Sequence, residues 1–184
     1  MSEQKQDTIS AKDWRHLKEL GWVKHAGSAA AIWIRPGSQC LMLLREGRTL
    51  RAYPCSTSAA GLGNRNGSLQ TPTGWHAIGA KTGGDVPIGA ILKDRKWTGQ
   101  VWRPGDASAE DMVLSRILRL AGLEEGVNLG GEVDTWQRYI YIHGTNAEHS
   151  LGRPSSRGCI RLSNKDVVDL YERVSLGCRV LIAD

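Results

Sequence analysis

The chain has 184 residues, of which 40% are hydrophobic and 23% are charged, the size and composition of one globular domain. Its net charge is +5, but the basic residues are scattered rather than gathered in a block, so we expect no nucleic-acid partner. The cysteines have neither zinc-site spacing nor the density of a disulfide scaffold. We therefore expect no metal or other cofactor, and four free thiols: Cys40, Cys55, Cys159 and Cys178.

The first residues predict a short helix that straps across the domain. Ser10 is a favourable N-cap, apolar residues recur at helical spacing over residues 11–20, and Gly21 ends the pattern. The N-terminus holds two acidic residues and no apolar run, unlike a secretory signal, and the run 40–44 is too short to span a bilayer. We therefore expect a cytoplasmic protein, or a periplasmic or extracellular one if a leader is missing from this chain.

Alternating and β-branched segments follow, and they predict strands at 29–34, 39–45, 49–56, 75–81, 91–92 and 97–103. Pro36-Gly37-Ser38 predicts the hairpin turn between the first two strands. Trp97 and Trp102 are interpreted as core residues rather than as a glycan-stacking platform. Many short strands with few helices indicate a mainly β fold.

The C-terminal half predicts two helices and a closing strand. Residues 108–111 are a variant of the capping box, and helical spacing follows over 112–120. Ser163 or Asn164 begins a final helix that runs to about Val174, and residues 178–183 form the last strand.

The residue types that could carry catalytic chemistry lie between these two predicted helices. The alternating strand 139–142 ends at His143-Gly144, and Gly158-Cys159 follows across one polar loop. A free thiol has a pKa near ~8.5, so a nucleophilic cysteine needs a nearby cation or a base that takes its proton. The histidine can be that base, and the carbonyl of Gly144 can orient its imidazole.

The glycine before the cysteine completes this interpretation. Gly158 lets a substrate carbonyl approach the backbone, where the N–H groups of Gly158 and Cys159 can stabilise an oxyanion. The competing interpretation is a small buried cysteine and a satisfied core histidine. Spacing alone does not separate the two.

This stretch resembles the catalytic motif of the L,D-transpeptidase family, also called the YkuD family. The family pattern is a strand ending in His-Gly-Thr, a loop, Ser-x-Gly-Cys-Ile-Arg, and then Asn and Asp. The chain has these residues in order as His143-Gly144-Thr145, Ser156-Arg157-Gly158-Cys159-Ile160-Arg161, Asn164 and Asp166. A second family signature, Thr-Pro-Thr-Gly, is present as Thr71-Pro72-Thr73-Gly74.

The resemblance divides the chain into an N-terminal extension, 1–29, and a catalytic domain, 30–184. It implies a β-sandwich of mixed sheets with a few peripheral α-helices. It also implies that Cys159 is the nucleophile, His143 the acid and base, and Gly144 the residue that orients it. Substrate-binding residues would be Arg161, Ser156, Arg157, Thr73 and Gly74. Arg157 departs from the members that carry a second histidine directly before Gly-Cys.

The implied reaction cleaves the L,D bond of a peptidoglycan stem tetrapeptide through a thioacyl enzyme. With water as the acceptor, the protein would be a cytoplasmic L,D-carboxypeptidase that releases terminal D-alanine from muropeptides in murein recycling. With an amine, it would be an envelope L,D-transpeptidase that forms cross-links or exchanges D-amino acids. A non-catalytic peptidoglycan-binding module is a further alternative, and the oligomeric state stays open.

Overall fold

The computed structural model describes residues 8–107 and 111–184. Its helices are α1 (Ala11–Glu19), α2 (Trp22–His25) and α3 (Asn164–Arg173), with short 3-10 turns η1 (Gly131–Val133) and η2 (Glu148–Ser150). Its strands are β1 (Ala31–Arg35), β2 (Cys40–Arg45), β3 (Arg48–Pro54), β4 (Gly74–Thr82), β5 (Ala90–Lys93), β6 (Lys96–Val101), β7 (Leu114–Gly122), β8 (Tyr141–Gly144), β9 (Ile160–Leu162) and β10 (Arg179–Ile182). No helix among these described residues is both long and apolar enough to cross a membrane.

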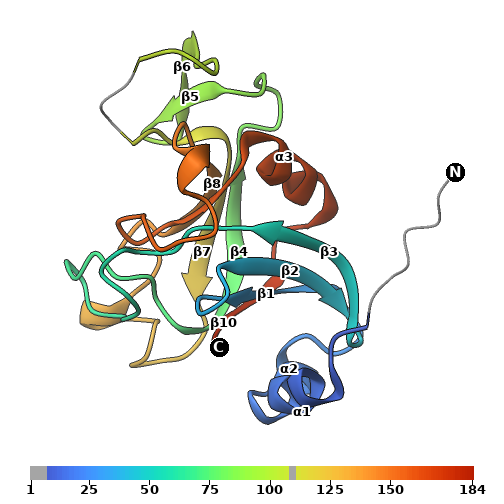
Figure 1. The fold of residues 1–184 in the computed structure, drawn as a ribbon. Coiled ribbons are helices and arrows are strands. Elements are labelled where there is room, and N and C mark those ends of the chain that lie inside the picture. Colours follow the sequence, from blue (N-terminus) through green and yellow to red (C-terminus); the bar gives the residue numbers. More distant parts are fainter. Residues whose placement is uncertain (1–7, 108–110) are drawn as a thin grey trace, which may run out of the picture.

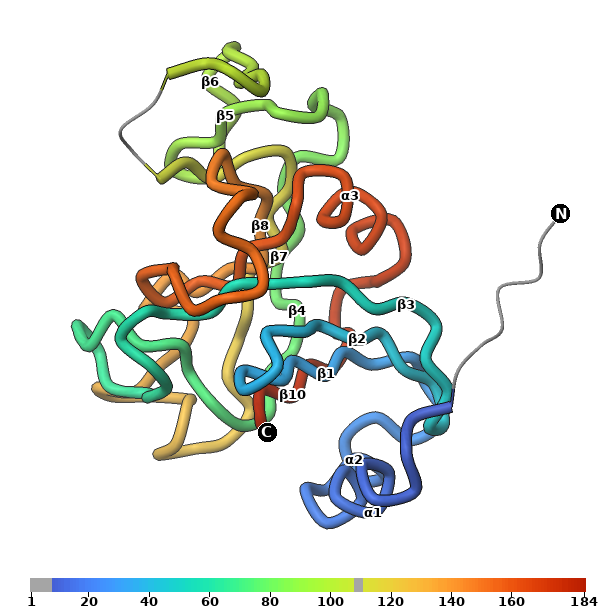
Figure 2. Tube along the Cα trace, in the orientation of Figure 1, coloured from blue at the N-terminus to red at the C-terminus, as the bar shows by residue number. Residues whose placement is uncertain are grey.

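The fold is mainly β with few helices, as predicted, and its strands form one mixed sheet. The order is β3-β2-β1-β10-β4-β7-β5-β6. Off this path, β8 pairs with β7, and β9 pairs with β8. The pairs β1/β10 and β8/β9 are parallel, whereas the other paired strands are antiparallel. The last strand, β10, therefore lies beside β1, and the two ends of the domain meet in the sheet (Figures 1 and 2).

The sheet curls around the main core. An isolated bridge joins Ser56, just after β3, to Arg161 in β9, so the two ends of the curl meet again. Inside it, apolar side chains of β1 to β4 and β7 to β10 pack with Val167 and Leu170 of α3. The curl holds β9 and the residues before it against the rest of the domain.

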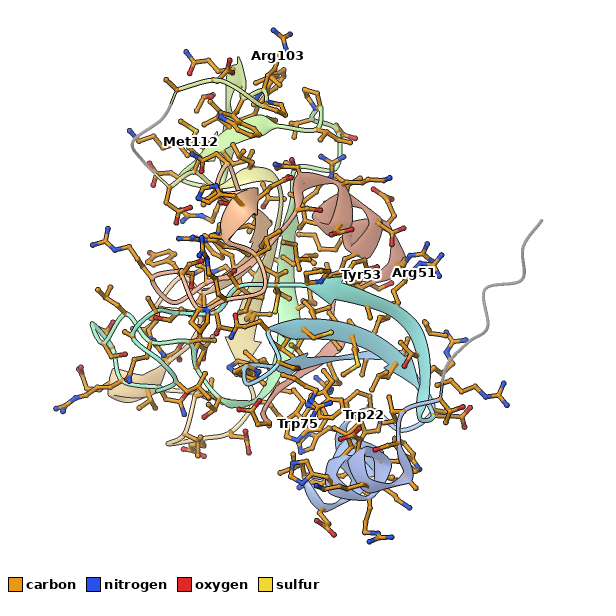
Figure 3. The ribbon with its side chains drawn as sticks, in the orientation of Figure 1. Trp22, Arg51, Tyr53, Trp75, Arg103 and Met112 are labelled. Carbon is orange, nitrogen blue, oxygen red and sulfur yellow. The ribbon has the colours of Figure 1, made fainter. Side chains whose placement is uncertain are left out.

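Helix α3 confirms the predicted final helix. Ser163 is its N-cap, with the side-chain oxygen accepting a hydrogen bond from the Asp166 N–H at 3.0 Å. On its outer side, Asp169 accepts a hydrogen bond from Tyr53 of β3 at 2.7 Å. Figure 3 shows Tyr53 and Arg51 on the β3 arrow beside this helix.

The N-terminal helices cover the other face of the sheet, and α1 confirms the predicted helix. Ser10 caps α1 through the Asp13 N–H at 3.0 Å. The ring centroids of Trp22 and Trp75 lie 5.7 Å apart in a second core between these helices and β1, β2, β4 and β10 (Figure 3). The described residues thus place one apolar layer on each face of the sheet.

The predicted helix over 112–120 is wrong. This segment is β7, which pairs with β4 on one side and β8 on the other, with its apolar residues buried on both faces. A strand buried on both faces has no clean period of two, so its apolar residues can also match helical spacing. The predicted capping residues 108–110 lie outside the described residues.

The predicted core position of Trp97 is also wrong. Trp97 lies on β6 with 46% of its surface exposed, and its indole N–H donates to the Gln100 carbonyl at 3.0 Å. The β5–β6 hairpin extends beyond the rest of the sheet (Figure 1), and the side chains of β6 are mostly exposed. Trp102, at the base of the hairpin, is half-buried.

Candidate active site

The predicted histidine and cysteine share one face of two adjacent strands. Strands β8 and β9 run parallel, with Ile142 opposite Ile160 and His143 opposite Arg161. Ile142 and Ile160 point into the main core. Because side chains alternate along a strand, His143 and Arg161 point to the opposite face, and Cys159 lies directly before β9 on that same side.

The imidazole of His143 is held in one tautomer. Its Nδ1–H donates to the Gly144 carbonyl at 2.8 Å, so the proton sits on Nδ1 and the lone pair on Nε2. The predicted orienting contact is therefore present. The side chain is 3% exposed, and this burial lowers the pKa of His143. At neutral pH the imidazole is uncharged and able to accept a proton.

Residue 144 must be glycine for a packing reason. A Cβ there would lie 2.5 Å from Asn164 Oδ1 and 2.7 Å from the Leu114 carbonyl oxygen. Asn164 is itself fixed, because it donates to the Thr145 carbonyl at 2.9 Å and accepts from Ser115 Oγ at 2.7 Å. The backbone that orients His143 is thus packed tightly against α3 and β7.

The thiol of Cys159 bonds to backbone rather than to the imidazole. Its sulfur accepts a hydrogen bond from the Tyr141 N–H at 3.4 Å, and the thiol donates to the Tyr139 carbonyl at 3.6 Å. Burial raises the pKa of Cys159 to about 11, and the nearby Arg161 and Arg138 offset this only in part. The sequence-based expectation that cations lower this pKa is met in direction, but burial outweighs them.

Arg161 is buried and belongs to an ion pair that sequence reasoning missed. It is 4% exposed, and its guanidinium pairs with the carboxylate of Asp111. Asp111 also accepts from Thr145 Oγ1 at 3.3 Å. Binding of a substrate carboxylate by Arg161 stays a prediction, since its carboxylate partner among the described residues is Asp111.

The loop before the cysteine is closed by Ser156. Its hydroxyl donates to the Cys159 carbonyl at 2.5 Å and accepts from the Gly158 N–H at 3.3 Å. Gly158 has φ +124°, a backbone conformation that side chains rarely adopt. Ser156 therefore shapes the turn that precedes Cys159, while the oxyanion role of Gly158 and Cys159 stays a prediction. Arg157 is exposed.

The Thr-Pro-Thr-Gly segment contacts this loop through Thr71, which was not among the predicted substrate-binding residues. Thr71 Oγ1 donates to the Gly158 carbonyl at 2.9 Å and accepts from the Ser58 N–H at 2.9 Å. Thr73 instead bonds to Asn64, through its backbone N–H at 2.8 Å and its hydroxyl at 3.3 Å.

Glycine at position 74 is favoured by its backbone conformation. A Cβ there would lie 2.1 Å from Glu124 Oε2, and its φ is +91°. For both Thr73 and Gly74, a part in substrate binding stays a prediction.

Comparison with known proteins identifies the family. The model of the L,D-transpeptidase catalytic domain, YkuD, matches residues 29–182. The probable L,D-transpeptidase YbiS of Escherichia coli K12 is 35% identical over 105 residues, which are 55% of this chain and 34% of that protein. The putative L,D-transpeptidase YqjB of Bacillus subtilis is 54% identical over 47 residues, covering 26% of this chain and 27% of that one.

Solved structures share the fold. LD transpeptidase LdtMt1 in complex with imipenem has a TM-score of 0.52 at 19% identity, and the match covers 85% of this chain and 59% of that one. L,D-transpeptidase 3 from Mycobacterium tuberculosis, with a faropenem-derived adduct, has a TM-score of 0.52 at 18% identity, covering 85% and 61%. The chain thus spans less than two thirds of these relatives. Since the family model matches all but the first 28 and the last two residues, this protein belongs to the YkuD family of L,D-transpeptidase catalytic domains.

Proposed function

We propose that this protein is a cysteine-dependent peptidoglycan enzyme that cleaves the L,D bond of stem tetrapeptides through a thioacyl intermediate. The observation that carries the proposal is the fixed tautomer of His143, whose Nδ1–H bonds to the Gly144 carbonyl at 2.8 Å on the strand beside Cys159. A merely structural histidine needs no free Nε2 lone pair on the same face as a thiol.

Both groups begin uncharged. When the substrate binds, Nε2 of His143 takes the thiol proton, and Sγ of Cys159 attacks the carbonyl of the diamino acid at position three. A C–S bond forms, the C–N bond to the terminal D-alanine breaks, and the imidazolium returns its proton to the departing amine. General acid–base catalysis of this kind contributes on the order of 10²–10⁴-fold.

If water accepts the acyl group from the thioester, the enzyme is an L,D-carboxypeptidase, and this is the more specific activity that we propose. Water then attacks the thioester, the tripeptide leaves as a free acid, and the thiol is restored. The proposed setting is murein recycling in the cytoplasm, because recycled muropeptides are the tetrapeptides that a hydrolase meets there. Tetrapeptide should accumulate in the cytosol of a deletion strain, and unchanged pools would contradict this setting.

Amine transfer is the second candidate, because the matched relatives are named L,D-transpeptidases. An amine in place of water would give a cross-link or an exchanged D-amino acid from the same thioester. The bond that breaks and the residues that break it are the same in both candidates.

Mass spectrometry of purified protein with a disaccharide-tetrapeptide, with and without excess D-methionine, tests the proposal. Tripeptide in both incubations, and none with Cys159→Ala, supports hydrolysis. A dominant D-methionine product supports amine transfer instead.

A carbapenem separates an enzyme from a binding module. We expect a covalent adduct on the wild-type protein and none on Cys159→Ala. No product in any incubation and no adduct would favour the non-catalytic module.

A further inference from the structure

A cavity of about 400 Å³ lies beside the nucleophile. Its walls include Tyr139 and Tyr141, the two residues whose backbone bonds to the Cys159 sulfur. Ile117 of β7 and Leu92 of β5 also line it. The remaining wall is the turn of the β5–β6 hairpin, where Asp94 and Arg95 reach the cavity.

This hairpin turn is unusual in its residues. Lys93 pairs with Lys96, so Asp94 and Arg95 alone make the turn, with φ of 48° and 63°. Two-residue turns with both φ positive strongly favour Asn-Gly or Asp-Gly. An arginine at the second position is held in a sparsely populated conformation, which is common where a side chain serves a site.

The arginine side chain is directed to the tyrosine wall. Arg95 donates to the Tyr141 hydroxyl at 3.2 Å, and its guanidinium lies 5.2 Å from the ring centroid of Tyr139. Neither Asp94 nor Arg95 belongs to an ion pair among the residues that the structure describes. One carboxylate and one guanidinium thus line the cavity, each without an ionic partner there.

Adjacent opposite charges fit a ligand group that carries both charges. We infer that Asp94 and Arg95 select stem peptides whose third residue ends in a free amino-acid group, as in diaminopimelate, over those that carry lysine. The carboxylate of that group would bind Arg95 and its ammonium would bind Asp94. The inference rests on the proposed function, because it concerns the same tetrapeptide.

Three tetrapeptides test this selection, with diaminopimelate, with diaminopimelate amidated on its side-chain carboxyl, and with lysine at position three. We expect the wild-type protein to prefer the first by about 10–100-fold in kcat/KM, the range expected for one charge-assisted hydrogen bond. Arg95→Gln should lower kcat/KM for the diaminopimelate peptide to that for the amidated peptide. It should leave kcat/KM for the lysine peptide unchanged. Asp94→Asn should lower kcat/KM for all three peptides, since the side chain at position three carries an ammonium group in each.

Two further variants test whether a lost preference results from a change in the folded structure. Arg95→Gly suits the turn better than arginine, so it should fold normally and lose the preference. Lys96→Gln alters an exposed cation next to the turn that does not line the cavity, and it should keep the preference.

Equal rates of the wild-type protein on the three peptides would overturn the inference. So would an equal loss on all three with Arg95→Gln, because that result assigns the guanidinium to the terminal D-alanine carboxylate. Calorimetric binding of the same peptides to Cys159→Ala judges selection without turnover. A binding preference that Arg95→Gln removes would support the inference even if the proposed reaction fails, and equal affinities would overturn it.

Discussion

The thiol of Cys159 and the imidazole of His143 are both uncharged at neutral pH. Burial raises the pKa of Cys159 and lowers that of His143, and both shifts oppose a resting thiolate–imidazolium pair. The proposed reaction therefore requires transfer of the thiol proton once the substrate is bound. This places Cys159 apart from cysteines that a helix N-terminus or a neighbouring cation keeps ionised.

The first prediction follows from the raised pKa of about 11. In the free protein, alkylation of Cys159 by iodoacetamide should rise about tenfold per pH unit from pH 8 to 10, since only the thiolate reacts. Peptide mass spectrometry resolves Cys159 from Cys178, whose pKa burial also raises to about 11.

The profile should barely move in His143→Gln, because burial rather than the imidazole sets the pKa of the thiol. Turnover of the tetrapeptide should nevertheless be lost in that variant. A midpoint below pH 8 in the wild-type protein would instead mean a preformed ion pair.

The second prediction concerns Asp111. Asp111→Asn leaves the buried guanidinium of Arg161 without its carboxylate, and we expect a loss of about 1–3 kcal/mol in the free energy of unfolding. Asp111 also raises the pKa of His143. Its removal should move the acidic limb of kcat/KM against pH to lower pH.

A purely structural role for Asp111 would lower stability and leave the pH profile in place. Asp106→Asn is the matched control, because Asp106 is exposed and its side chain accepts from the Arg103 N–H. That variant should change neither the pH profile nor the stability.

Sequence reasoning found the residues of this site whose role is local and missed the one that acts across the fold. The histidine with its glycine and the cysteine with its glycine lie within one stretch, so residue type and order identify them. Asp111 lies 50 residues from Arg161, in a segment whose pattern also fits a helix cap. The spacing of apolar residues within one segment cannot predict an ion pair between two segments that the curved sheet brings together.

At the scale of elements, the Thr-Pro-Thr-Gly segment is bonded to the loop that precedes Cys159. The buried hydroxyl of Thr71 joins Ser58 and Gly158 through two hydrogen bonds. Since Gly158 directly precedes Cys159, this contact helps to fix the position of the thiol.

The third prediction compares the two threonines of this segment. Thr71→Val keeps the shape but leaves a buried N–H and a carbonyl unpaired, at about 1–3 kcal/mol for each group. We expect lower stability in urea unfolding and a fall in kcat of about tenfold or more, since small displacements at a nucleophile are costly.

Thr73→Val is the control, because its hydroxyl accepts only one long bond of 3.3 Å. Its stability should change by about 0.5 kcal/mol or less. A raised KM in this variant would support the predicted substrate contact of Thr73, and equal effects of both substitutions would contradict the distinction drawn here.

A helix or strand could be predicted from the sequence where one local pattern clearly favoured it. Helix α3 has a serine cap and a single apolar face, both visible in sequence. The pattern of β7 also fits a helix because its residues are buried on both faces, and its pairing partners β4 and β8 come from distant segments. Pairing of this kind overrides local spacing.

On the scale of the whole molecule, the N-terminal helices are a structural layer. They lie at the opposite end of the molecule from the β5–β6 hairpin (Figure 1), and they cover Trp33, Leu44 and Leu181 on the outer face of the sheet. The sequence predicted a strap helix, but its depth of burial depends on side chains from β1, β2, β4 and β10 that local patterns do not bring together.

The fourth prediction separates this layer from the site. Trp22 is fully buried, whereas its neighbour Val23 is 60% exposed on the same helix. Trp22→Ala should lower the free energy of unfolding by about 3–5 kcal/mol, and Val23→Ala by about 0.5 kcal/mol or less. Circular dichroism in urea measures both, since fluorescence would change with the lost indole. Because Trp22 packs in the core with β1, β2, β4 and β10, Trp22→Ala should keep its kcat at temperatures where it stays folded. A stable variant with reduced kcat would instead mean that this layer is coupled to the site.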